Sequence, residues 1–176
     1  RAVTGFGPTA VLGGVAGYAP AVVIYGDSIA RGSGDGVSSG LMLGQKIGYI
    51  ARGLRLADDR LIPSVNAARD GETITHIAGE ATAAGIANSR RWSLLRYATH
   101  AVFNGGSNDI VGAPTLAYMQ ATYLRAWGLA KQQGVKVAQC LILPRTSGTY
   151  TSAGGQTIAT GFGVGELRDQ VNAWIR

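Results

Sequence analysis

The stretch AVVIYGDSIARG, residues 21–32, joins a run of apolar residues to a glycine and then to a polar turn. Its first part, AVVIY, is continuous and rich in β-branched side chains, which is typical of a strand covered on both faces in a parallel sheet. Gly26, Asp27 and Ser28 follow directly. The stretch therefore predicts a buried strand that ends in a sharp turn carrying a serine hydroxyl and leading into a helix.

Short apolar runs alternate with longer amphipathic runs from this stretch to the end of the chain. Repeated β-α units predict a mainly parallel sheet with helices on both faces. We expect an α/β fold over residues 21–176, a three-layer α/β/α sandwich with a flavodoxin-like sheet, after an irregular lead-in at 1–20. Further strands are predicted at 61–66, 98–103 and 135–143, helices at 39–54, 73–87, 115–133 and 165–176, and a loop at 145–163.

The composition indicates a single globular domain. The chain has 176 residues, of which 46% are hydrophobic and 15% charged. No stretch reaches the roughly 20 apolar residues that span a bilayer, so no membrane span is expected. The single cysteine cannot form an internal disulfide, and one cysteine with two histidines argues against structural zinc. No metal and no cofactor are predicted.

The net charge of +6 would permit binding to a polyanion, but the basic residues are spread along the chain. The densest basic cluster consists of Arg90, Arg91 and Arg96. We interpret it as a solvated helix end rather than a patch for nucleic acid. Nucleic acid is therefore not an expected partner.

Three predicted turns carry residues of chemical interest, and each follows a strand. Ser28 offers a hydroxyl and a backbone amide at a helix start, Gly71 a backbone N–H without a side chain, and Asn108 an amide donor. Each has a plainer interpretation, since Ser28 fits a helix cap, Gly71 a turn glycine and Asn108 an Asx turn. Because the carboxyl ends of parallel strands share one sheet edge, the three should converge. A hydroxyl with neutral donors predicts an acyl-transfer site with an oxyanion hole.

Three ordered segments resemble a known family. VVIYGDSIARG at 22–32, NAARDGETI at 66–74 and FNGGSNDI at 103–110 are similar to blocks I, II and III of the SGNH hydrolases, also called GDSL-type esterases and lipases. The resemblance implies Ser28 as nucleophile and first oxyanion donor, the N–H of Gly71 as second donor, and the side chain of Asn108 as third. It also covers Asp27 and Asp109, which we interpret as side chains that shape the loops.

The chain departs from the family at the last block, Asp-x-x-His, which supplies the catalytic acid and base. Asp169 is followed three residues later by Asn172. His100 lies near the start of the predicted strand 98–103, at the opposite sheet end, and His76 is interpreted as a surface or helix-packing residue. The base and acid are therefore absent from this chain, as are the family's last strand and helix. A second polypeptide, a truncated chain or a naturally baseless member would each explain this, and we expect a second polypeptide carrying Asp-x-x-His.

The resemblance implies a serine ester hydrolase that acts through an acyl-enzyme. The 145–163 segment is rich in Ser, Thr and Gly and should rim the pocket, which favours small or carbohydrate-linked acetyl esters. The alternative is a ligand-binding module of the same fold without a catalytic base. A flavodoxin-like nucleotide or receiver domain has little support, since no phosphate-cradling glycine loop follows the first strand.

Overall fold

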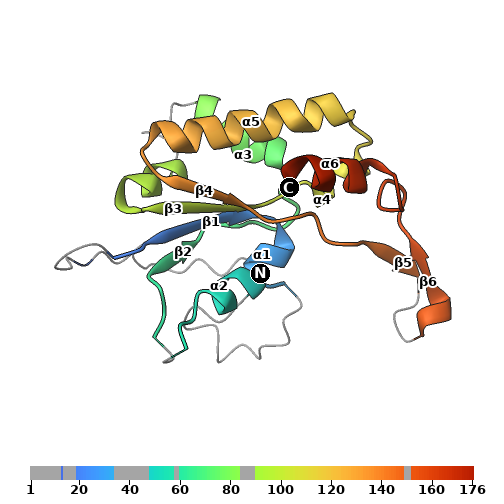
Figure 1. Ribbon diagram of the computed structural model, residues 1–176, viewed down its shortest axis with the longest axis horizontal. Helices are drawn as coiled ribbons and strands as arrows, with labels where there is room; N and C mark the ends of the chain where they lie inside the picture. Colours follow the sequence, from blue (N-terminus) through green and yellow to red (C-terminus); the bar gives the residue numbers. More distant parts are fainter. Residues whose placement is uncertain (1–12, 14–18, 34–47, 58–59, 84–89, 149–151) are drawn as a thin grey trace, which may run out of the picture.

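A four-stranded parallel sheet forms the centre of the computed structural model (Figure 1). The strand order is β2-β1-β3-β4, so β1 lies inside the sheet between β2 and β3. The strands are β1 Val22–Gly26, β2 Ser64–Asn66, β3 His100–Asn104 and β4 Lys136–Gln139. The structure describes residues 13, 19–33, 48–57, 60–83, 90–148 and 152–176.

Helices cover both faces of this sheet (Figure 1). One face carries α1 Ser28–Arg31 and α2 Tyr49–Gly53, and the other carries α3 Ile74–Ala83, α5 Leu116–Gln132 and α6 Leu167–Ile175. The 3-10 helix η1 Trp92–Tyr97 precedes β3, and the short α4 Ser107–Val111 follows it. The expected three-layer α/β/α architecture is confirmed.

The apolar core lies on both sides of β1, whose residues are all buried. On the α3 and α5 side, the ring of Tyr25 stacks on those of Trp92 and Phe103, each at 5.2 Å between centroids. On the other side, Ile24 packs with Ala30 and neighbouring apolar residues. A strand buried on both faces is what the AVVIY run predicts, so this expectation is confirmed.

The register of the sheet aligns the carboxyl ends of its strands. Gly26 of β1 pairs with Asn104 of β3, and Ile24 pairs with Asn66 of β2. The chain after β2 continues this pairing, since the amide of Arg69 donates to the carbonyl of Gly26 at 2.9 Å. The turns that follow β1, β2 and β3 therefore emerge at one edge of the sheet.

The helices and strands predicted from the sequence are present in the described residues, with bounds that differ by a few residues. The largest difference within the sheet is at β4, because the apolar run 135–143 pairs with β3 only over Lys136–Gln139. The predicted helix 39–54 is represented by α2, and its part at 39–47 lies outside the described residues. Most of the lead-in at 1–20 also lies outside them.

The prediction of a plain loop at 145–163 is wrong. This segment contains an antiparallel hairpin of β5 Thr146–Gly148 and β6 Gln156–Ile158, which extends away from the main sheet (Figure 1). The β6 strand is exposed along its length, so it has no apolar face to mark it in the sequence. The hairpin is held by backbone pairing, which polar residues such as Ser and Thr permit.

None of the helices in the described part of the chain is long and apolar enough to cross a bilayer.

Replacing Phe103 with alanine should lower the free energy of unfolding by about 3–5 kcal/mol, because it removes a fully buried ring from the centre of the core. Urea denaturation measures this loss. Leu124→Ala is the control, since the Leu124 side chain is 57% exposed and its truncation should cost no more than about 0.5 kcal/mol. Equal losses in the two variants would contradict the packing described for β3.

Candidate active site

Ser28 is the first residue of α1, directly after β1. Asp27 caps this helix, because its carboxylate accepts the N–H of Ile29 at 2.9 Å. The interpretation of Ser28 as a helix cap is therefore wrong. The Ser28 side chain is half-buried, and no other described residue forms a hydrogen bond with its Oγ or its backbone N–H. Both groups are thus available to a ligand within this part of the structure.

Two buried carboxylates shape the turns on either side of this serine. Asp27 is 2% exposed and Asp109 is 7% exposed. Asp109 accepts the N–H of Ile74 at 2.8 Å and the hydroxyl of Thr75 at 2.9 Å, so it holds the beginning of α3. Burial raises the pKa of Asp27, although hydrogen bonds from backbone amides, Ile29 first among them, partly offset the shift. Both carboxylates hold helix starts, as expected for side chains that shape the loops.

Gly71 lies in the turn between β2 and α3, with a φ of +71°. A Cβ atom there would meet nothing within 4 Å. Glycine is therefore favoured by the left-handed backbone conformation and not by lack of space. The residue is exposed, and this geometry fits both a turn glycine and a backbone N–H that faces a ligand.

Asn108 lies in α4, directly after the turn that follows β3. Its Nδ2 donates to the backbone carbonyl of Glu72 at 2.9 Å. The Asx-turn interpretation is wrong, because no backbone N–H of the described residues donates to Asn108 Oδ1, and the amide reaches the neighbouring turn instead. A side-chain amide has two N–H groups, so one remains for a ligand. The turn before it needs Gly106, where φ is +114° and a Cβ atom would lie 2.1 Å from the hydroxyl of Tyr123.

Hydrogen bonds between the turns confirm that the three sequence segments meet at one sheet edge. The bond from Asn108 to Glu72 joins the turn after β3 to the turn after β2. Asp70, one residue before Gly71, accepts hydrogen bonds from Arg31 and from Ser33 Oγ. These bonds join the turn after β2 to α1. The convergence expected from the strand order is therefore present.

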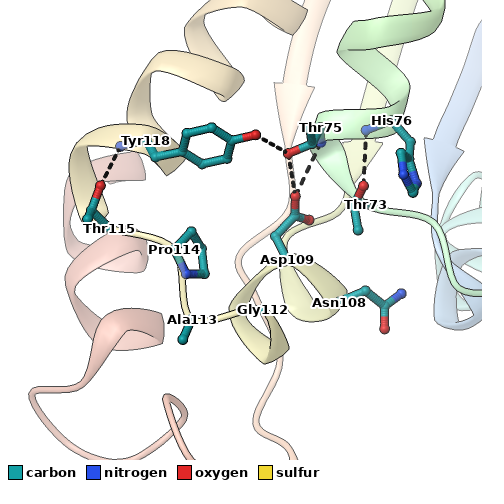
Figure 2. A pocket seen from close by; sticks show the side chains of 10 residues that line it. All are labelled: Thr73, Thr75, His76, Asn108, Asp109, Gly112, Ala113, Pro114, Thr115 and Tyr118. Carbon is teal, nitrogen blue, oxygen red and sulfur yellow. Dashed lines mark hydrogen bonds between the residues drawn. The ribbon is translucent and has the colours of Figure 1, made fainter.

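Asn108 and residues at the start of α3 line an open pocket of about 590 Å³ (Figure 2). Tyr118 of α5 closes one side, and its hydroxyl lies 3.4 Å from that of Thr75. The lining combines hydroxyls, an amide and an imidazole with apolar surface, and it includes neither Ser28, Gly71 nor any described residue of 145–163. Thr73 just before α3 and residues from α3, α4, α5 and the segment between the last two line it: Thr73, Thr75, His76, Asn108, Asp109, Gly112, Ala113, Pro114, Thr115 and Tyr118.

The two histidines of the chain differ in their distance from this edge. His100 begins β3 and pairs with Val22 at the amino end of β1, so the length of both strands separates it from Ser28. This agrees with the expectation that His100 lies at the opposite end of the sheet. His76 is exposed and lines the pocket together with Asn108 (Figure 2). Within the described residues, no hydrogen bond joins either histidine to Ser28.

The interpretation of Arg91 as part of a solvated helix end is wrong, because this side chain is buried and paired with two carboxylates. Its guanidinium donates to both carboxylate oxygens of Glu72 and, at 2.9 Å, to Glu80. Burial alone would raise the pKa of Glu80, but hydrogen bonds and charge from Arg91, helped by Arg69, hold that pKa below its ordinary value. In the sequence Arg91 has only basic and aromatic neighbours, so no local pattern marked this pairing.

The arrangement offers an accessible hydroxyl and several neutral N–H donors at the same sheet edge. Such a set can place a nucleophile against a carbonyl carbon and hold the negative charge that develops on its oxygen. The buried carboxylates nearby are engaged by backbone amides, hydroxyls and Arg91, so they act on the shape of the turns. The chemistry that these residue types favour is acyl transfer.

Comparisons with known proteins show that the fold is similar to that of solved esterase and G-D-S-L family structures. No family model and no curated protein matches the chain. Solved structures do match, and the expected resemblance is thereby confirmed at the level of the fold. The identities of 14–21% show the fold alone.

Three of these structures serve as examples. A G-D-S-L family protein from Desulfitobacterium hafniense DCB-2 has a TM-score of 0.56 and 14% identity over 88% of this chain. A lipolytic protein of the G-D-S-L family from Veillonella parvula DSM 2008 has a TM-score of 0.52 and 21% identity over 89%. The psychrotrophic esterase EstA from Pseudoalteromonas sp., inhibited by monoethylphosphonate, has 0.50 and 21% over 71%. The matches cover 69%, 70% and 62% of those chains, respectively.

Replacing Asp27 with asparagine should preserve the helix cap and remove a buried charge. Because the pKa of Asp27 is raised above 3.8 in the folded protein, its contribution to stability is full below 3.8 and is lost as the pH rises through the folded pKa. Asp27→Asn should therefore gain stability relative to the unmodified protein as the pH rises from 3 to 7, measured by urea denaturation. Asp27→Ala is the control and should lose about 1 kcal/mol with the cap. An equal loss in both variants at pH 7 would show that the charge itself is needed.

Proposed function

We propose that this chain supplies the nucleophile and the oxyanion hole of a serine ester hydrolase. The observation that carries the proposal is the convergence of the turns after three adjacent parallel strands. That convergence brings the segments of Ser28, Gly71 and Asn108 to one sheet edge. The Ser28 hydroxyl has no partner among the described residues, which is suitable for a nucleophile that must meet a substrate.

In the proposed reaction, a histidine removes the proton from Ser28 Oγ while Oγ attacks the carbonyl carbon of the ester. The carbonyl oxygen becomes negative and is held by the N–H groups of Ser28 and Gly71 and by Nδ2 of Asn108. When the tetrahedral intermediate collapses, the bond to the alcohol breaks and the histidine gives its proton to the leaving oxygen. Water then attacks the acyl-enzyme by the same steps and releases the acid.

We propose that the histidine comes from an Asp-x-x-His segment on a second polypeptide. β4 pairs with β3 on one side only within the described residues, so its other edge is open to a further strand. A strand added there would lie beyond β4 in a parallel sheet and would end at the same edge as β1. Because the carboxyl ends of parallel strands share one sheet edge, the proposed strand would bring the base near Ser28.

We propose small or carbohydrate-linked acetyl esters as substrates. Asn108, the proposed third oxyanion donor, lines the pocket in Figure 2, so an ester bound to it would extend into this pocket. Hydroxyls of Thr73, Thr75 and Tyr118 line it and suit a ligand with several hydroxyl groups of its own. Its open shape suits a sugar or small alcohol better than a long acyl chain, which would need an enclosed apolar channel.

The first test combines a fluorophosphonate probe with denaturing intact mass of the purified protein. We expect the 18.2 kDa chain to gain the mass of the probe and a second polypeptide to accompany it. Ser28→Ala should abolish the labelling, and the exposed Ser152→Ala is the matched control that should not change it. A lone chain that takes no probe would contradict the hydrolase and favour the binding module.

Asn108→Ala should lower kcat by about 10²–10³ with little change in KM, because the lost donor acts mainly on the oxyanion of the transition state. Hydrolysis of a small activated acetyl ester measures both constants. Asn108→Asp is the matched variant, since it keeps the shape but replaces the donor with an acceptor. It should be at least as impaired. Full turnover in either variant would remove Asn108 from the mechanism.

A further inference from the structure

Arg91 is a buried charged side chain whose partners include Glu72, next to Gly71 of the proposed oxyanion hole. It is 6% exposed. Both of its terminal nitrogens donate to the carboxylate of Glu72, with Nη2 at 2.9 Å from Oε1. Nε donates to Glu80 at 2.9 Å, and Nη1 also donates to the backbone carbonyl of Ala67 at 2.9 Å. The planar guanidinium therefore meets two carboxylates and a carbonyl at once.

The groups around Arg91 belong to three different parts of the fold. Ala67 follows β2, Glu80 lies in α3, and the hydroxyl of Tyr25 in β1 donates to the backbone carbonyl of Arg91 at 3.0 Å. Glu80 of α3 and the carbonyl of Ala67 after β2 thus hold the guanidinium, while Tyr25 of β1 holds the backbone of Arg91. A side chain supported in this way can hold a neighbouring loop in a more precise position than the loop would adopt without it.

Glu72 links this network to the proposed donors. It follows Gly71 directly in the chain, and it is buried. Its side chain is held by Arg91, while its backbone carbonyl accepts Nδ2 of Asn108 at 2.9 Å. One residue therefore connects the guanidinium to the peptide next to Gly71 and to the amide of Asn108.

The energetics favour a role in geometry over a role in stability. Burying an ion pair costs solvation for both ions, and apolar side chains of similar volume often stabilise a protein as well or better. What a bidentate pair provides is a defined direction, because the two parallel N–H···O bonds fix the plane of the carboxylate. Here the pair fixes the carboxylate of Glu72, the residue directly after Gly71 in the turn.

We infer that Arg91 is a positioning residue for the oxyanion hole, because it clamps Glu72 and thereby sets both the N–H of Gly71 and the side-chain amide of Asn108. The inference rests on the proposed function, since it assigns the geometry of that same site. Arg91 does not touch the reacting atoms. It acts through Glu72 on two donors that follow different strands, Gly71 in the turn after β2 and Asn108 in α4 after β3.

The test begins with Arg91→Lys, which keeps the charge but loses the planar fork. We expect kcat to fall about 10- to 100-fold while KM stays within about twofold, because misplaced donors weaken the transition state. The double variant Arg91→Lys/Asn108→Ala should lose less than the product of the two single losses, since both changes damage the same hole. Multiplicative losses in the double variant would overturn the inference.

Arg69→Lys is the matched control. Arg69 pairs with Glu80, as Arg91 does, but its side chain is exposed and does not touch Glu72. We expect its kcat to stay within about twofold of the unmodified protein, as for most surface substitutions. If Arg69→Lys slows turnover as much as Arg91→Lys, the effect belongs to Glu80 and the clamp on Glu72 is overturned. Glu72→Gln, which removes one charge and keeps the shape, replaces Arg91→Lys if that variant does not fold.

A measurement that needs no activity separates this inference from the proposed function. In ¹⁵N-labelled protein, one side-chain N–H of Asn108 should exchange slowly because it donates to Glu72, and Arg91→Lys or Glu72→Gln should speed this exchange at least tenfold. Unchanged exchange in a folded variant overturns the positioning role. If Ser28 takes no phosphonate while the exchange responds as expected, the proposed hydrolase fails and the clamp stands.

Discussion

The parallel pairing of β1 with strands on both of its sides is the constraint on which the rest of the structure depends. β1 is buried on both faces, so its backbone groups must be satisfied within the sheet. Pairing with β2 and β3 does this and aligns their carboxyl ends, with Gly26 opposite Asn104. Because all three strands run in one direction, the turns that follow them have to share an edge. The proposed site is a consequence of that alignment.

Buried charged side chains hold the turns at this edge of the sheet in place. Asp27 holds the start of α1, Asp109 holds the start of α3, and Arg91 holds Glu72 in the turn between β2 and α3. Ionised groups away from water need partners in defined directions, since an unsatisfied charge in the interior is costly. These side chains therefore fix the turns more firmly than exposed polar residues would. The Ser28 hydroxyl, which is proposed to react, is left without such a partner among the described residues.

Features that depend on neighbouring residues in the chain could be predicted from the sequence, whereas contacts between residues far apart in the chain could not. The run before Gly26 predicts a buried strand because a continuous β-branched run is a local pattern, and the turns are predicted because glycine and polar residues follow each strand. The hairpin at 145–163 was missed since its strands have no apolar face. Arg91 was taken for a solvated residue because its neighbours in the chain are basic and aromatic, while its partners lie 11 to 24 residues earlier.

By itself, the sequence determined the order along the chain of the main-sheet strands and the helices that pack on them, the α/β class and the three turns that carry Ser28, Gly71 and Asn108. These follow from hydrophobic periods and from residue types at strand ends, which short windows contain. Only the tertiary structure decided that Asn108 reaches Glu72 and that Arg91 is buried against it. Those contacts join residues 36 and 19 positions apart, and which polar groups meet over such separations is set by the packing of the whole sheet and its helices, which no local pattern encodes.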